Sequence, residues 1–275
     1  MTDIAFADAA FADAAAVTAV SAAEHAAARA GVEVREVTDI DEQAAVVRLL
    51  AEIWGRSLDN PPVPPELLRA FSKAGNYISG AFAADELVGA AIAFHSTPDR
   101  HALHSHIAGV APALAGRSVG FAMKLHQRGW ALARGIDAIE WTFDPLVARN
   151  AHFNVAKLRA LPVEYLPDFY GPMTDAINEG DETDRILVRW ELRDDEVAAA
   201  ASGRPALVDS TAPGHVAVAV PADIERLRAA APAQARAWRH AVRDRLTELL
   251  GAGGRVVGFD RSDGYIVRLG EGNAR

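Results

Sequence analysis

The stretch from Val110 to Met123 holds a turn whose residue types suit the binding of an anion. An apolar strand pattern precedes the turn, a helical pattern follows it, and Gly116 and Gly120 punctuate the connection. The first amides of a helix have no partner within the helix and lie at the positive end of its dipole, so they can hold a phosphate without a charged side chain. The spacing matches neither GxGxxG nor GxxxxGKS/T. A strand-to-helix turn that binds nothing is the alternative interpretation.

Two strands near this turn carry side chains that can accept a proton. His104 and His106 lie two residues apart on an expected strand at 103–110, so both point to one face. A neutral imidazole near pH 7 suits removal of a proton from an ammonium group, directly or through a water molecule. Glu140 lies in an otherwise apolar strand at 136–143, where burial would raise its pKa. For each residue, a hydrogen-bonded structural role is the alternative.

Four histidines within twelve residues also raise the question of a metal site: His95, His101, His104 and His106. Neither a carboxylate pattern nor HExxH accompanies them. The loop at 96–100 is typical of an exposed turn, and we expect no metal.

The elements that must position these residues follow from the hydrophobic periodicity. Alternation predicts strands and a 3.6-residue period predicts helices, and their order indicates a mixed α/β or α+β protein. In chain order the sequence predicts a strand at 32–37, a helix that includes 45–54, a short helix near 66–73, a hairpin of strands at 77–82 and 87–94, a strand at 103–110, a helix at 119–133, a strand at 136–143 and a helix at 148–158.

The turn resembles the acyl-CoA loop of the GNAT N-acyltransferase superfamily, whose pattern is V-x-P-x-x-Q/R-G-x-G-I/V-G/A. Ala115 replaces the usual Gln or Arg, Ser118 replaces the second Gly, and Arg117 offers a positive charge nearby. The positions that match are Val110, Pro112, Gly116, Val119 and Gly120. The order of elements over about residues 32–192 is also similar to that family.

The resemblance implies an α+β GNAT fold, with a mixed sheet whose central strands at 103–110 and 136–143 splay apart. Pantetheine would enter the gap like an extra strand, and the turn at 115–120 would hold the pyrophosphate of acetyl-CoA or another acyl-CoA. Backbone amides around Gly109 and Val110 would stabilise the oxyanion. The position at which the family often places an acid falls on His104.

A second cluster, over residues 141–158 and 165–171, is similar to the motif after the fifth strand of a bacterial GNAT subgroup with a C-terminal extension. In that family an Asn contacts the pantetheine arm, a role that Asn150 or Asn154 can fill, although Asn150 can equally cap the helix. The family's helix often carries a Tyr that protonates the leaving thiolate, but Val155 stands near that position. Tyr170 or Tyr165 can replace it from the following loop, with packing as the alternative.

Composition narrows the function further. The 275 residues, half of them apolar, are enough for a full core, and a net charge of -9 without a basic run argues against a nucleic-acid partner. The absence of cysteine excludes disulfides and a cysteine nucleophile. The start lacks a secretory signal and no apolar span reaches 18 residues, so we expect a soluble, cytoplasmic protein without a membrane partner.

The chain divides by composition into four parts. We expect an Ala-rich helical segment at 1–31, a GNAT acyltransferase domain at 32–195, a flexible linker at 196–213, and a C-terminal α+β appendage at 214–275 that packs a helix and a hairpin on the core.

These features predict an acyl-CoA-dependent N-acyltransferase that works by direct transfer in a ternary complex. The expected acyl group is acetyl, with succinyl as an alternative, and the expected acceptor is a small amine or amino acid. A second hypothesis is a GNAT-shaped sensor that binds acyl-CoA or another small ligand without turnover. A third is a scaffold whose Ala-rich helix and appendage form an oligomer interface, as in a homodimer.

Overall fold

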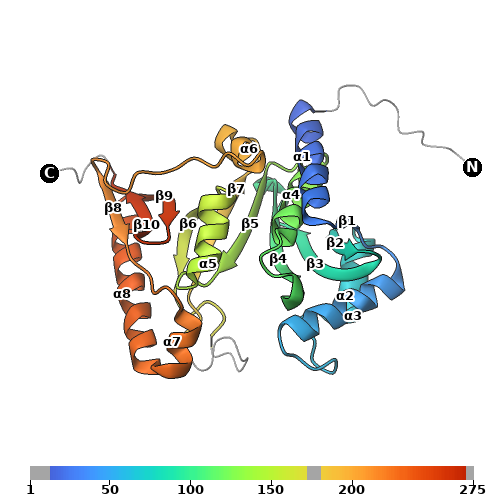
Figure 1. The fold of residues 1–275 in the computed structure, drawn as a ribbon, viewed down its shortest axis with the longest axis horizontal. Helices are drawn as coiled ribbons and strands as arrows, with labels where there is room; N and C mark the ends of the chain where they lie inside the picture. Colours follow the sequence, from blue (N-terminus) through green and yellow to red (C-terminus); the bar gives the residue numbers. More distant parts are fainter. Residues whose placement is uncertain (1–12, 172–180, 271–275) are drawn as a thin grey trace, which may run out of the picture.

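The computed structural model describes residues 13–171 and 181–270 and contains a seven-stranded and a three-stranded sheet (Figure 1). The strand order of the large sheet is β1-β2-β3-β4-β5-β7-β6. Its neighbours pair antiparallel except β4 and β5, which are parallel. This mixed sheet confirms the predicted α+β class. The strands are β1 (Glu33–Glu36), β2 (Tyr77–Ala83), β3 (Glu86–His95), β4 (Ala102–Val110), β5 (Ala138–Phe143), β6 (Leu161–Leu166) and β7 (Arg185–Glu191).

Helices cover both faces of this sheet. Alternate residues of β2 and β3 enter two separate cores: Tyr77 and Ala91 belong to the core that includes α1 and α4, whereas Ile78 and Ile92 pack with α2 and α3. The helices before the fifth strand are α1 (Ala14–Ala30), α2 (Ile40–Ile53), α3 (Pro65–Lys73) and α4 (Val119–Leu132), with short 3₁₀ turns at Pro98–Arg100 and Pro112–Leu114.

The Ala-rich helix α1 lies along α4, because small side chains let the two backbones approach closely. A Cβ on Gly129 of α4 would lie only 3.2 Å from the backbone of Val20. Asp13 caps the start of α1 by accepting a hydrogen bond from the amide of Ala15, and Gly31 ends the helix in the left-handed conformation. Residues 1–12 of the predicted N-terminal segment lie outside the described residues.

The second half of the chain departs from the sequence predictions in three places. The helix expected at 148–158 is a short α5 (Ala148–Ala151) continued by a π-helical turn (His152–Lys157). Strands β6 and β7 were not predicted. The expected linker at 196–213 is not wholly flexible, since α6 (Asp195–Ala201) covers its start with Asp194 as N-cap.

The C-terminal appendage forms the α+β unit that the sequence predicts, and Figure 1 shows it beside the edge strand β6. Its three-stranded sheet has the order β8-β10-β9, and β9 and β10 form the expected hairpin. Its elements are β8 (His215–Val218), α7 (Ile224–Ala230), α8 (Pro232–Gly251), β9 (Arg255–Asp260) and β10 (Gly264–Arg268). Among the described residues, no helix is long and apolar enough to cross a membrane.

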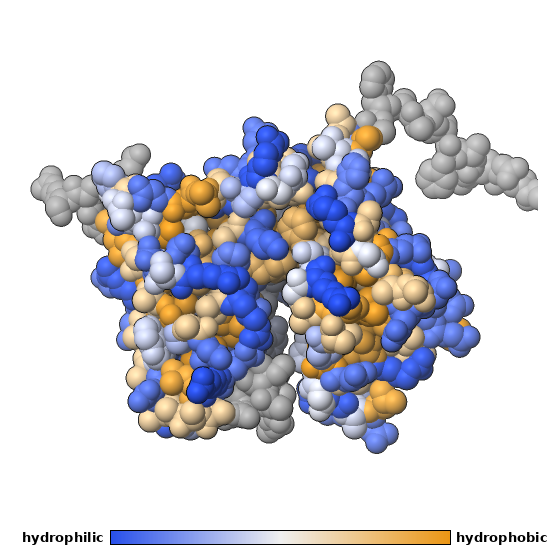
Figure 2. Space-filling model, viewed as in Figure 1, coloured by the Kyte–Doolittle hydropathy of each residue, from blue (hydrophilic) through white to orange (hydrophobic). Residues whose placement is uncertain are grey.

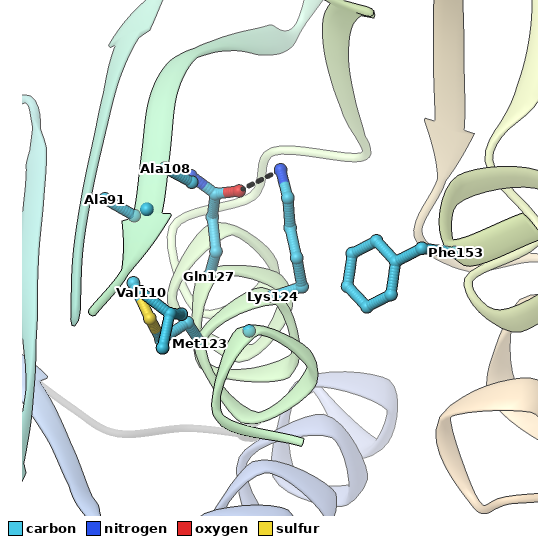
Figure 3. A pocket seen from close by; sticks show the side chains of 9 residues that line it. Ala91, Ala108, Val110, Met123, Lys124, Gln127 and Phe153 are labelled. Atoms are coloured by element: carbon cyan, nitrogen blue, oxygen red, sulfur yellow. Dashed lines mark hydrogen bonds between the residues drawn. The ribbon is translucent and has the colours of Figure 1, made fainter. Parts of the chain in front are cut away.

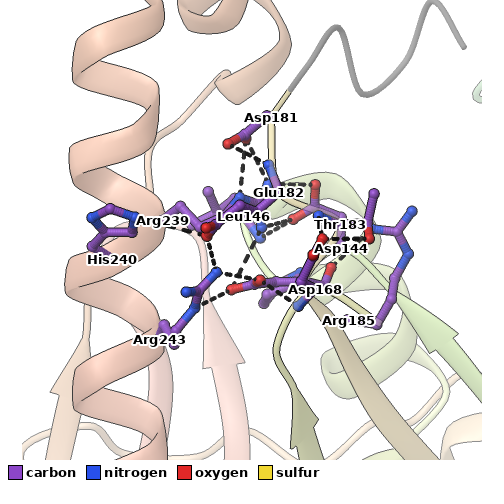
Figure 4. A network of polar contacts seen from close by, with 12 residues as sticks. Asp144, Leu146, Asp168, Asp181, Glu182, Thr183, Arg185, Arg239, His240 and Arg243 are labelled. Atoms are coloured by element: carbon purple, nitrogen blue, oxygen red, sulfur yellow. Dashed lines mark hydrogen bonds and ion pairs between the residues drawn. The ribbon is translucent and has the colours of Figure 1, made fainter. Parts of the chain in front are cut away.

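A buried network of charges joins this appendage to the end of β5 (Figure 4). Asp144, the residue after β5, accepts hydrogen bonds from Arg228 of α7 and Arg239 of α8, and Asp181 accepts from the same two arginines. Burial opposes ionisation of Asp144, but the charges of Arg239 and Arg228 outweigh it and hold the pKa of its carboxyl below the ordinary value. The network therefore fixes α7 and α8 against the large sheet.

Candidate active site

A cleft opens where β4 and β5 separate. The two strands pair over only three positions, ending with His104 opposite Glu140, and then diverge. The resulting cavity has a volume of about 800 Å³, and Figure 2 shows the surface hollowed between the two halves of the molecule. Its lining includes the end of α2, the open edges of both strands, the start of α5 and the appendage residue Glu225. The predicted splay of the central strands is thus present.

The turn before α4 offers a set of free backbone donors. Gly116 and Ser118 both adopt the left-handed conformation, with φ of 81° and 64°, which turns the chain sharply into the helix. Within the described part of the chain, the N–H groups without a hydrogen-bond partner in this turn are those of Gly116, Ser118, Val119, Gly120 and Phe121. This arrangement suits a phosphate or pyrophosphate group.

The open edge of β4 presents further amides to the cleft. Ala111 donates its N–H to the carbonyl of Val88 on β3. Since successive residues of a strand direct their N–H groups to opposite edges, those of Ala108 and Val110 point to the open side, whereas that of Gly109 points towards β3. Of the two amides predicted to face the splay, Val110 does so. At Gly109 the absence of a side chain instead lets the end of α2 pack closely against β4, because a Cβ there would lie 2.7 Å from the ring of Trp54.

The paired histidines lie on the face of β4 opposite α4, as their spacing predicts. Their ring centroids are 6.3 Å apart, and His104 stacks on Phe94 at 5.1 Å. A bulge in the β3–β4 pairing leaves His106 without an opposite residue, and His106 is exposed on the cleft wall, whereas His104 lies behind it. Burial lowers the pKa of both imidazoles, and His106 lowers that of His104 further. Both rings are therefore neutral near pH 7.

Glu140 lies at the closed end of the splay rather than along the cleft. Its Oε1 accepts hydrogen bonds from Arg100 at 3.0 Å and from Arg189 at 2.7 Å, and its side chain is only 5% exposed. Hydrogen bonds between a carboxylate and guanidinium groups are charge-assisted and hold both partners firmly in place. This environment makes Glu140 a structural anchor for β5 and β7.

Helix α5 and the π-helical turn that follows it bring both predicted asparagines to the cleft. Asn150 lies inside α5, whose N-cap is Val147, so it does not act as the helix cap that the sequence also allowed. Asn154 is buried and accepts a hydrogen bond from the indole of Trp141 on β5 at 3.3 Å. The wider π-helical turn is a feature often found at functional sites.

The two predicted tyrosines differ in their surroundings. The hydroxyl of Tyr165 donates to Asp184 at 2.6 Å, which ties it to the polar network of the appendage. Tyr170 lines the cleft with 45% of its surface exposed, and its hydroxyl lies 3.3 Å from that of Thr142 on β5. Only Tyr170 is therefore placed to meet a bound molecule.

The sequence analysis missed a buried lysine at the vertex of the splay. Lys124 of α4 extends between the strands, where its Nζ donates to Gln127 (Figure 3). The same Nζ donates to Ser105 on β4 and lies 3.7 Å from the ring centre of Trp141 on β5. Burial lowers its pKa to about 7. A signal was available, because Lys124, Gln127 and Arg128 recur at helical spacing within an apolar segment and all three are buried.

A small apolar pocket of about 120 Å³ continues the cleft beside Lys124. It is lined by Val110, Gly120, Met123 and Phe153, among others, and so connects the turn before α4 with the open edge of β4. In the part of the chain that the structure describes, histidines and carboxylates form no group of three or more that could hold a metal ion.

Comparison with known proteins relates part of this chain to a family. Residues 16–147 match the model of the acetyltransferase (GNAT) domain, so the match begins within α1. No curated protein sequence matches the chain. This part of the chain therefore contains a GNAT acetyltransferase domain.

Solved structures with a similar fold cover little more than half of this chain. A GNAT-family acetyltransferase from Streptococcus pneumoniae is 16% identical, over 57% of this chain and 98% of that one, with a TM-score of 0.48. A ribosomal-protein-alanine N-acetyltransferase from Brucella melitensis is 14% identical, over 58% and 99%, with a TM-score of 0.46. A Salmonella typhimurium protein solved with its cofactor acetyl-CoA is 15% identical, over 60% and 95%, with a TM-score of 0.49.

Proposed function

We propose that this protein transfers an acetyl group from acetyl-CoA directly to the nitrogen of a small amine or amino acid, with both substrates bound at once. The observation that carries the proposal is a pair of adjoining cavities that share Lys124: Gly120 of the turn with free amides lines one, and the open edge of β4 and the proton-accepting His106 line the other. The coenzyme would supply the activated acyl group.

The residues present fit a nucleotide-linked thioester. The free amides of the turn would hold the pyrophosphate, with Arg117 as an exposed neighbouring charge. Asn150 and Asn154 would contact the pantetheine arm from the other wall. The open amides of Ala108 and Val110 would bind amide or carbonyl oxygens, and the one nearest the thioester would stabilise the charge that its oxygen gains.

His106 is the residue that we propose as the general base. Its ring lines the cleft wall, and the partial burial of the ring there keeps its pKa below the ordinary value, so that it is ready to accept a proton at neutral pH. His104, predicted for this role, lies behind it and would position it through the contact that both rings make with Phe94. Glu140 is held by two arginines and would contribute to the site only by fixing the position of β5.

The acceptor would enter between α2 and the appendage. Trp54 and Pro62 give this end of the cleft an apolar wall, and the ion pair between Arg149 and Glu225 closes part of its rim. A rim built from two distant parts of the chain favours a small acceptor. Tyr170 and Thr142 lie on the same side and would orient it.

The decisive experiment measures thiol release from acetyl-CoA and from succinyl-CoA with a panel of amines and amino acids. We expect amine-dependent release with acetyl-CoA, together with a rise in melting temperature as coenzyme A is added. At a coenzyme concentration of about 100 Kd, the added stability is roughly 2.7 kcal/mol. Binding without release would identify a sensor, and the absence of both would disprove the proposal.

A further inference from the structure

The transfer reaction needs a proton donor for the departing sulfur, and the position at which the family resemblance leads one to expect a tyrosine is occupied by Val155. Val155 is fully buried and apolar. Tyr170 lines the cleft on the acceptor side, in the loop after β6, and not along the pocket next to α4. The sulfur side of the site therefore requires another acid.

We propose that Lys124 is this acid, a catalytic residue that protonates the leaving thiolate from the vertex between β4 and β5. The proposal rests on the proposed acyl transfer. Lys124 lies on the helix whose first amides form the anion site, about one turn beyond Gly120, and it lines both the cleft and the small apolar pocket. Figure 3 shows its side chain between the edge of β4 and Phe153.

The contacts of Lys124 hold the amine in place without neutralising it. Nζ donates to Ser105 at 2.9 Å and to Gln127 at 3.2 Å, and the face of Trp141 covers it. An ammonium group has three donors and no acceptor. Two neutral partners thus leave one N–H available, and no carboxylate among the described residues forms an ion pair with it.

The surroundings also set the proton affinity of this amine. Burial brings the pKa of Lys124 to about 7, where a group can both give and regain a proton at the working pH. Near Lys124, the titratable groups on the strands are His104 and His106, on the other face of β4, and Glu140 on β5. Farther along α4, Tyr77 of β2 contacts His126 and Glu36 of β1 accepts a hydrogen bond from Trp130. The charge of Glu140 is already engaged by Arg100 and Arg189.

The proton balance closes. The amine nitrogen forms a bond to the acyl carbon while the carbon–sulfur bond breaks, and the sulfur leaves with the bonding electron pair. The sulfur takes a proton from Nζ, and the amine gives a proton to His106. Solvent then reprotonates Lys124 and deprotonates His106, so that one amide and one free thiol are produced.

The test compares Lys124→Met with the wild type on two acyl donors, with hydroxylamine as an acceptor that needs no recognition. With acetyl-CoA we expect kcat to fall by at least about 100-fold, in the range typical of a lost general acid. With the acetyl thioester of 5-thio-2-nitrobenzoate, whose thiolate leaves without a proton, we expect a loss below fivefold. A structural role would reduce both rates equally and would overturn the proposal, as would a kcat for acetyl-CoA within threefold of the wild type.

Controls separate this result from other failures. Lys73→Met, at the exposed end of α3, should keep the wild-type rate, and Tyr170→Phe should lose less with acetyl-CoA than Lys124→Met does. Lys124→Met should bind coenzyme A as tightly as the wild type. If the wild type itself releases no thiol, the proposed function fails; if only the donor-dependent difference is missing, the assignment of Lys124 fails.

A second readout does not depend on turnover. The chain has three lysines, Lys73, Lys124 and Lys157, so ¹³C-labelled lysine gives few signals and Lys124→Met identifies the one in question. We expect its signal to titrate near pH 7. The unfolded chain binds this proton up to a pH of about 10.4, so the stability of the wild type should rise between pH 7 and 10 relative to Lys124→Met. Titration above pH 9.5 would overturn the proposal.

Discussion

At the scale of single residues, Ser118 shows how this chain departs from its family's loop while keeping the loop's shape. Its φ of 64° is one that glycine adopts freely, and the family pattern has glycine at this position. The serine thus carries backbone strain next to the free amides. The strain is compatible with binding, because the amides depend on the main chain and not on the side chain.

Ser118→Gly should stabilise the protein. Relief of the left-handed strain is worth about 1 to 2 kcal/mol, and the greater freedom of glycine in the unfolded chain removes about 0.5 to 1, so we expect a net gain of roughly 0.5 to 1 kcal/mol in the free energy of unfolding. Urea titration measures it. Ser118→Ala removes the hydroxyl but retains the strain, and an equal gain in that variant would show that the backbone argument is wrong.

The histidines should govern the acid side of the pH profile. Because burial holds the pKa of His106 below its ordinary value, kcat/KM of the wild type should stay constant down to about pH 6.5 and fall only below it. His106→Gln should lower kcat/KM by about 100-fold at pH 7 and abolish this acid limb. His101→Gln, in the exposed turn before β4, is the control. An unchanged profile for His106→Gln would exclude it as the base.

At the scale of elements, the turn between β4 and α4 can be tested against a turn of the same conformation elsewhere. Gly116 and Gly135 have φ of 81° and 71°, and a Cβ on either would meet no atom within 4 Å. Valine at either position should therefore cost a similar 1 to 2 kcal/mol of stability. Only Gly116→Val displaces free amides, so we expect calorimetry to show coenzyme A affinity lowered at least tenfold by Gly116→Val and unchanged by Gly135→Val. Equal affinities would place the anion site elsewhere.

The sequence predicted the elements whose signal is local. The helix starting at Val119, the strands of the β2–β3 hairpin and the C-terminal hairpin all have clear periodicity between turn residues. Strand β7 was missed although Ile186, Val188 and Trp190 alternate towards the core. The π-helical turn after α5 could not be predicted, because the i to i+5 pattern arises from packing rather than from residue preference.

The candidate site was predictable only where the main chain forms it. The turn at 115–120 follows from a pattern of Gly and Pro, and its geometry agrees with that pattern. The environments of the side chains that were predicted wrongly or missed depend on residues far away in sequence. Arg189 binds Glu140, and Asp184 binds Tyr165. Ser105 and Trp141 surround Lys124. Such partners are set by tertiary packing, which a single sequence does not display.

At the scale of the whole molecule, the appendage is attached by charge as much as by apolar packing. Asp144 lines the cleft and also binds two arginines of the appendage, so the site and the attachment share a residue. Tyr265 adds a hydrogen bond from β10 to the carbonyl of Pro145 at 2.9 Å. Loosening the appendage should therefore disturb the acceptor end of the cleft before it disturbs the anion-binding turn.

Asp144→Asn should destabilise the protein by about 3 kcal/mol, because it leaves two buried guanidinium groups with one carboxylate fewer. Since the folded pKa of Asp144 is below its unfolded value of about 3.9, the wild type gains this stability above that pH and loses it as the pH falls further. Urea unfolding at pH 7 and pH 3 should thus show a difference that shrinks in acid. Glu248→Gln, from an exposed pair with Arg245, should change stability by less than about 0.5 kcal/mol. If Asp144→Asn also lowers the free energy of unfolding by less than about 0.5 kcal/mol, the network does not hold the appendage against the large sheet.

The short pairing between β4 and β5 leaves each strand with a bare backbone edge, and the two edges face each other inside one molecule. An unpaired edge on an outer surface invites a strand from a neighbouring chain and thereby starts aggregation. Here the walls of the opening, built by α2 on one side and α5 on the other, keep another sheet from reaching these edges. The unpaired backbone groups thus remain available for hydrogen bonds to an extended ligand in the cleft, but they are shielded from pairing with a strand of another copy of the chain.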